Sequence, residues 1–130
     1  MTIKIKRAYE EAAPSDGKRV LIDRLWPRGI SKEEAHLDLW LKDVAPSTEL
    51  RQWFGHDPAR WPEFQRRYCR ELSANPEAMQ QLIDDARKGP LTLVYGARDQ
   101  EHNDAVVLKA FLEDEATARH GHPKRGATRR

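Results

Sequence analysis

Two arginine-containing segments of the sequence could bind an anionic ligand. The first, Asp23-Arg24-Leu25-Trp26-Pro27-Arg28-Gly29, places two guanidinium groups around a tryptophan that can stack on an aromatic ligand or on arginine. The second, Gly96-Ala97-Arg98-Asp99, adds an arginine to a turn of small residues, where backbone amides can approach an anion. His102 and Asn103 follow in the next turn. These residue types predict a site for a phosphate or carboxylate group.

A third segment, Trp53-Phe54-Gly55-His56-Asp57, could supply another wall of the same site. His56 and His102 are the candidate acid and base groups, because imidazole exchanges a proton near neutral pH. Whether the site turns over a substrate stays open at this stage. The predicted ligand contacts are Asp23, Arg24, Trp26, Arg28, Trp53, Arg98, Asp99 and Asn103.

Each of these residues also has a purely structural interpretation. Asp23, Arg24 and Arg28 could form an ion-pair network that braces their own loop. The tryptophans could pack in the core, and Asp99 could cap a helix. His56 could bond the start of the next helix, and His102 could be a solvated surface residue.

The predicted strands place both arginine segments at one edge of a sheet. Alternation over residues 3–6, an apolar triplet within 18–25 and the apolar run 91–95 indicate three strands. The continuous run is typical of a parallel strand covered on both faces. Residues 36–44 alternate as a further extended segment, with a helix as the alternative. Ligands of open α/β sheets bind beyond the carboxyl ends of the strands. Each arginine segment directly follows a predicted strand and is therefore expected at that edge.

Helices are predicted between these strands. Ser47 can cap a helix that ends at Gly55, and apolar residues at spacings of three and four indicate a helix over 61–72. The next helix is delimited by Asn75-Pro76, as cap and first turn, and by Gly89-Pro90 as its stop.

A last helix, capped by Asp99 and apolar nearly all round over 105–112, completes the pattern. The predicted fold is α/β, with a small, mostly parallel sheet flanked by helices in a Rossmann-like three-layer arrangement. The chain has 130 residues and a net charge of +2, but residues 116–130 carry five basic residues and no acid. We therefore expect one α/β domain over 1–115 and a basic, disordered tail over 116–130.

Several other chemistries are excluded or disfavoured by the sequence. No apolar run is long enough to span a bilayer and the first residues lack a signal-peptide core, so we expect a cytoplasmic protein without membrane contact. Cys69 is the only cysteine and lies within a predicted helix, where it is expected to pack rather than react. No nucleotide-loop, dinucleotide or zinc-ligand motif is present, so no metal or cofactor is expected.

Four motifs occur together and in order along the chain. They are DRLWPRG at 23–29, APS at 45–47 followed by Leu50-Arg51, WFGH at 53–56, and LTLVYGARD at 91–99 followed by His102-Asn103. Over residues 3 to about 112 the chain resembles the YeaO-like bacterial proteins, a family of unknown function (domain of unknown function 488). The resemblance implies an α/β fold and no established activity. In related branches the turn after the last strand carries cysteines, and their absence here argues against thiol chemistry.

Three functions are compatible with these observations. The first is a pocket for a phosphate- or carboxylate-bearing small molecule, such as a nucleotide, held by Arg24, Arg28, Arg98 and the start of the last helix. The second is a nucleic-acid-binding accessory protein that uses the same edge and the basic tail. The third is a protein-interaction module without catalysis, with a homo-oligomer as one form.

Overall fold

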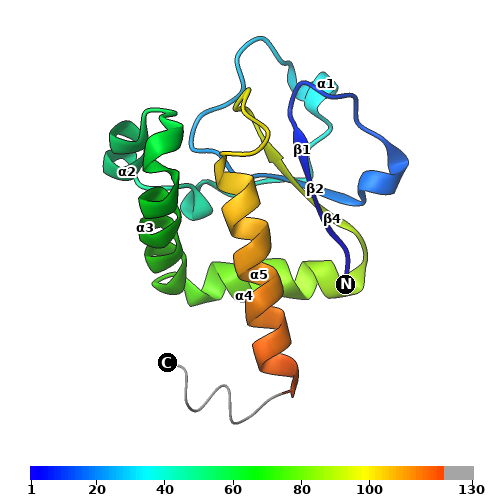
Figure 1. The fold of residues 1–130 in the computed structure, drawn as a ribbon. Coiled ribbons are helices and arrows are strands. Elements are labelled where there is room, and N and C mark those ends of the chain that lie inside the picture. Colours follow the sequence, from blue (N-terminus) through cyan, green and yellow to red (C-terminus); the bar gives the residue numbers. More distant parts are fainter. Residues whose placement is uncertain (122–130) are drawn as a thin grey trace.

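A computed structural model of the chain describes the backbone of residues 1–121 and the side chains of residues 1–118. Its four strands are all parallel, in the order β1-β4-β2-β3 (Figure 1). The strands are β1 Ile3–Arg7, β2 Lys18–Leu21, β3 Leu39–Trp40 and β4 Leu91–Tyr95. The helices are α1 Lys32–Ala35, α2 Thr48–Phe54, α3 Trp61–Ser73, α4 Pro76–Lys88 and α5 Asp104–Gly121. The predicted α/β fold class is confirmed.

Strand β4 is the centre of the sheet. It pairs with β1 on one side and β2 on the other, and all five of its residues are buried. The hydroxyl of Thr92 donates a 2.7 Å hydrogen bond to the carbonyl oxygen of Asp16, so this buried polar group has a partner. The apolar run predicted this burial correctly, because a strand covered on both faces cannot alternate apolar and polar residues.

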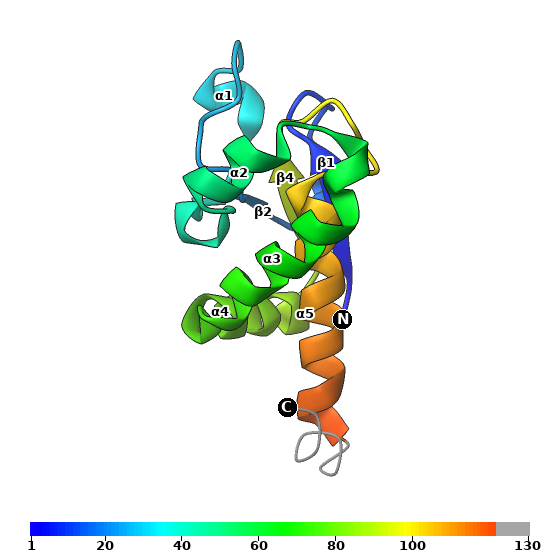
Figure 2. The same cartoon turned by 60° about the vertical axis from the view of Figure 1, so that its left-hand side comes forward.

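Helices α2 to α5 cover one face of the sheet. Figure 2 shows α3, α4 and α5 packed together and away from α1. The buried stripe of α3, Phe64, Tyr68 and Leu72, joins the same core as Leu82 and Ile83 of α4. Figure 1 shows α5 crossing α4 at a steep angle, and its apolar residues also lie in this core. This face therefore holds the main hydrophobic core.

The other face is covered by the long connection between β2 and β3, which includes α1, and it is divided into two halves. Toward the carboxyl ends of the strands, Leu21 and Val94 pack against Trp26 and Trp40. Toward the amino ends, it holds a buried ion pair between Asp16 and Arg19, described next. Sheet, main helices and this thinner covering form the predicted three layers.

The buried ion pair joins three parts of the chain. The guanidinium of Arg19 lies 2.7 Å from Asp16 Oδ2, and each side chain is 4% exposed. Arg19 also donates to the carbonyl oxygens of Ala35 and His36, which end α1. Burial alone would raise the pKa of Asp16, but hydrogen bonds from the Ala13 amide, Lys6 and Arg19 outweigh it and lower that pKa. The pair thus holds α1 against the sheet.

Local differences from the sequence-based expectation have identifiable causes. Only two residues of the segment 36–44 form a strand. Its partner β2 ends at Leu21, so the residues after Trp40 have no β2 residue to pair with. Asn75 occupies the N-cap position of α4, but its side chain makes no capping hydrogen bond. Its side-chain amide instead donates to the carbonyl oxygen of Asp43. Helix α5 continues to Gly121, past the boundary expected at 115, and residues 122–130 lie outside the described part.

We predict that Asp16→Ala lowers the free energy of unfolding by about 3–5 kcal/mol, because it leaves the buried Arg19 without its counter-charge. Chemical denaturation at pH 7 measures this change. Since the folded-state pKa of Asp16 lies below its ordinary value of 3.8, the contribution is present above that pH and is lost on acidification below it. The control is Glu63→Ala, which removes surface ion pairs with Arg66 and Arg67 and is expected to cost far less stability than Asp16→Ala. Equal losses in the two variants would contradict the structural role of Asp16.

Candidate functional site

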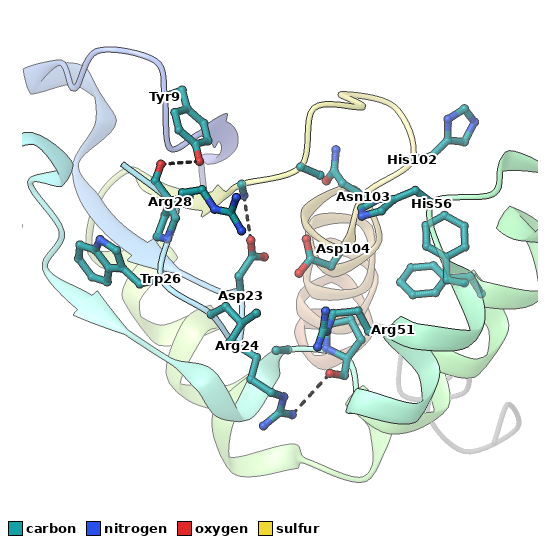
Figure 3. Close-up of a pocket in the computed structure, with 18 residues that line it drawn as sticks. Tyr9, Asp23, Arg24, Trp26, Arg28, Arg51, His56, His102, Asn103 and Asp104 are labelled. Carbon is teal, nitrogen blue, oxygen red and sulfur yellow. Dashed lines mark hydrogen bonds between the residues drawn. The ribbon is translucent and has the colours of Figure 1, made fainter. Parts of the chain in front are cut away.

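A cavity of about 460 Å³ opens at the carboxyl edge of the sheet. The loops that follow β1, β2 and β4 contribute to it, and residues of α2, α3 and the start of α5 close it (Figure 3). Its lining residues are Tyr9, Asp23, Arg24, Leu25, Trp26, Pro27, Arg28, Ala45, Pro46, Arg51, Phe54, His56, Phe64, Gly96, Ala97, His102, Asn103 and Asp104. Both arginine-containing loops singled out in the sequence therefore reach the same sheet edge, although only the first brings its arginines to the cavity.

Asp23 joins these two loops directly. Its Oδ2 accepts a 2.8 Å hydrogen bond from the backbone amide of Gly96, just after β4. Its carbonyl oxygen accepts a 2.7 Å bond from the indole of Trp40. Asp23 is consequently held at the centre of the cavity wall.

A second carboxyl group, from Asp104, faces Asp23. In Figure 3 the two side chains point toward one another, one from the loop after β2 and one from the first residue of α5. Burial and the neighbouring Asp23 carboxylate raise the pKa of Asp104 well above its ordinary value, although backbone hydrogen bonds at the helix start act in the opposite direction. Two adjacent carboxyl groups with one raised pKa favour a state in which the pair shares a proton.

Three arginines line the same cavity, and Figure 3 shows Arg28 and Arg51 on either side of the carboxyl pair. Within the described residues, no salt bridge of 4.0 Å or less joins Arg24, Arg28 or Arg51 to any acid. Among the described residues, the guanidinium of Arg24 makes one long hydrogen bond, 3.5 Å to the carbonyl oxygen of Pro46. Its buried Nε has no hydrogen-bond partner in this part of the chain. An arginine carries five donors, so most of the binding capacity of Arg24 is unused.

The two candidate acid–base histidines lie at the rim. The Nδ1 of His102 is 2.8 Å from Asp99 Oδ2, and its ring packs edge-on against Trp61 at 5.1 Å. Hydrogen bonds from the Glu101 amide and the His102 ring lower the pKa of Asp99. His56 is exposed and has a left-handed backbone with φ of 58°. Both histidines line the cavity, but His102 is already bonded to a carboxylate of its own loop.

Three predicted ligand contacts lie outside the cavity lining. The ring of Trp53 is covered by the guanidinium groups of Arg60 and Arg67, at 5.3 and 4.4 Å. Arg98 is exposed at the surface. Asp99 accepts hydrogen bonds from the Glu101 and His102 amides and so shapes the loop. The structure therefore does not place these three side chains on the wall of the cavity.

Two further predicted contacts line the cavity but have structural partners. The indole N–H of Trp26 donates to the carbonyl oxygen of Ile30 at 2.6 Å, and its ring packs edge-on against Trp40 at 5.4 Å. Asn103 is buried, and its Oδ1 accepts from the Val106 amide. The cap of α5 is therefore Asn103 and not Asp99, because the loop continues through Asp99 for a further turn. With Asn103 and the Asp104 carboxyl at the start of α5, its amides have partners and are not open to an anion.

Three polar residues that line the cavity were not predicted from the sequence. Tyr9 follows β1 at the same edge, and its hydroxyl donates to the carbonyl oxygen of Arg28 at 2.9 Å. Arg51 projects from α2 and lay within a motif without being selected, and Asp104 begins α5. All three lie within or beside a motif or near the end of a predicted element. None could be assigned to the cavity from the sequence, because the assignment depends on how the loop after β1 and the helices α2 and α5 pack.

The described residues also bear on metals and membranes. Among them, no group of three or more His, Cys, Asp and Glu side chains is arranged to hold a metal ion. None of the helices in this part of the chain has the length and apolar character required to cross a bilayer.

We predict that Asp104→Asn increases the free energy of unfolding at pH 7, because it removes the repulsion between two facing carboxyl groups. A raised carboxyl pKa costs stability above the ordinary value of 3.8, and a tenfold change in proton affinity corresponds to about 1.4 kcal/mol. The gain should shrink as the pH falls toward 4, because Asp104 is then protonated in the folded state and becomes increasingly protonated in the unfolded state as well. Denaturation curves from pH 4 to 8 measure it. A gain that does not depend on pH, or a loss at pH 7, would contradict the paired arrangement.

Comparison with known proteins agrees with the motifs. A family model described as the inactive DUF488-N3 subclade matches residues 2–128. The uncharacterised protein YeaO of Escherichia coli K12 is 45% identical over 112 residues, which cover 86% of this chain and 97% of that protein. An uncharacterised protein of Mycobacterium tuberculosis H37Rv is 41% identical over 110 residues, or 85% of this chain and 92% of that protein. No solved structure matches the chain with statistical significance. The chain belongs to the YeaO-like DUF488 family.

Proposed function

We propose that this protein binds a small molecule bearing a phosphate or carboxylate group in the cavity at the carboxyl edge of its sheet. The observation that carries the proposal is the set of arginines, Arg24, Arg28 and Arg51, that line one cavity without an acidic partner in the described residues. A half-buried guanidinium with an unbonded Nε lacks an acceptor that an anionic ligand would supply. The cavity volume lies in the range of small-molecule sites.

The proposed role is binding without turnover. The matching family model carries the description inactive, and we extend that description to this chain. It is consistent with the position of the histidines, because His102 is bonded to Asp99 and His56 is exposed at the rim. Under this proposal the cavity acts as a recognition site, and its occupant is released unchanged.

A small molecule is favoured over a nucleic acid as the ligand. Nucleic-acid interfaces carry arginines and lysines along an extended surface. Here the arginines without an acidic partner among the described residues line one cavity of about 460 Å³ and not an extended surface. The net positive charge of the chain comes from residues 119–130, which lie outside the part whose side chains are described and carry five basic residues and no acid; the rest of the chain has a net charge of −3.

We predict that Arg24→Ala abolishes stabilisation by anionic ligands and that Arg98→Ala does not. Arg98 is the matched control, because it is exposed, lies near the same edge and is outside the cavity lining. A ligand at ten times its Kd should stabilise the wild type by about 1.4 kcal/mol, a rise of a few degrees in Tm. A thermal-shift screen of inorganic phosphate, phosphate esters and carboxylates at constant ionic strength measures this. If no compound stabilises the wild type more than Arg24→Ala, the proposal is overturned.

A further inference from the structure

We propose that the Asp23–Asp104 carboxyl pair binds hydroxyl groups of the same ligand, so that the ligand class is a hydroxylated phosphate monoester such as a glycerol phosphate or a sugar phosphate. This inference rests on the proposed function, which concerns the anionic group of the ligand, and adds the groups that bind its hydroxyls. The pair lies at the centre of the cavity, between Arg28 and Arg51 (Figure 3).

The carboxyl pair has acceptor positions that its partners in the protein do not fill. One oxygen of Asp23 accepts the Gly96 amide, Asp104 hydrogen-bonds to Asp23, and backbone amides at the start of α5 bond the Asp104 carboxyl. Carboxylate oxygens accept up to two hydrogen bonds each, so acceptor positions remain toward the cavity. A ligand that fills the cavity must supply donors there, because burying the pair without donors would cost free energy.

The net charge of the cavity indicates the charge of its ligand. Arg24, Arg28 and Arg51 carry three positive charges, and a carboxyl pair that shares one proton carries one negative charge, which leaves about two positive charges. A phosphate monoester carries about −1.5 to −2 near neutral pH and balances this excess. An ammonium group would also donate to the acids, but a zwitterion has no net charge and would leave the arginines unbalanced. The donors are therefore assigned to neutral hydroxyl groups.

The acids and arginines of the cavity are held apart from one another. Acids and arginines line the same cavity without forming salt bridges to one another within 4.0 Å. The Gly96 amide holds Asp23 in place, and backbone hydrogen bonds at the start of α5 hold the Asp104 carboxyl. A ligand whose phosphate contacts an arginine and whose hydroxyl groups reach the carboxyl pair beside it satisfies both kinds of group.

The test compares two phosphate esters of similar size and equal charge, glycerol 3-phosphate and n-propyl phosphate, which differ in their hydroxyl groups. Titration calorimetry at constant ionic strength gives a Kd for each. We expect the wild type to bind glycerol 3-phosphate about tenfold more tightly, as hydrogen bonds to charged groups imply. In Asp104→Ala this preference should fall below about twofold, while n-propyl phosphate binds at least as tightly as before, since a negative charge has been removed.

The outcomes separate the two proposals. If neither ester binds the wild type, the proposed function fails and this inference fails with it. If both bind the wild type equally, or if the tenfold preference persists in Asp104→Ala, the hydroxyl assignment alone is overturned. Should Asp104→Ala not fold, Asp104→Asn preserves the shape of the helix start, and its preference is expected to drop at least threefold. A purely structural role for Asp104 would weaken both esters equally and would also overturn the assignment.

Discussion

The hydrogen bond from the Gly96 amide to the Asp23 carboxylate is the contact on which the candidate site depends. It forms because β2 and β4 are parallel neighbours, so the loops that follow them emerge at the same edge. It fixes one acid at the centre of the cavity and brings the loop that carries Arg24 and Arg28 against the start of α5. It adds to the backbone hydrogen bond from the Ile22 amide to the Val94 carbonyl oxygen, which already joins the ends of the two strands.

The same arrangement places groups together that do not stabilise the fold. Two carboxyl groups face one another, and three arginines lack acidic partners among the described residues. Stability has to come from elsewhere: the helical core on one face and the Asp16–Arg19 pair on the other, which lies toward the opposite end of the strands. The polar groups of the Asp16–Arg19 pair are bonded to one another and to the backbone, whereas the three arginines of the cavity have no acidic partner among the described residues. Such a contrast is expected where binding, and not folding, determines the side chains.

Local patterns in the sequence predicted the elements that local physics determines. The apolar run of β4, the stripe of α3 and the stop of α4 at Gly89 follow from periodicity and backbone preference. The meeting of two strand-end loops also followed, from the rule for parallel sheets. The outward position of Arg98 and the approach of Arg51 from α2 could not be predicted, because they depend on how a loop turns and how a helix packs. Asp99 and Asn103 are equally good caps by type, and only the path of the loop decides between them.

The central claim is that the unpaired arginines at the carboxyl edge form one anion site. An NMR titration of ¹⁵N-labelled protein with inorganic phosphate tests it most directly, because the buried Arg24 Nε–H and the Gly96 amide each report from the cavity. The account predicts saturable shifts at these two groups and at the side chain of Arg51, with Arg98 and the α3 arginines unchanged. Shifts confined to Arg98 and the α3 arginines, or no saturable shift at all, would contradict it.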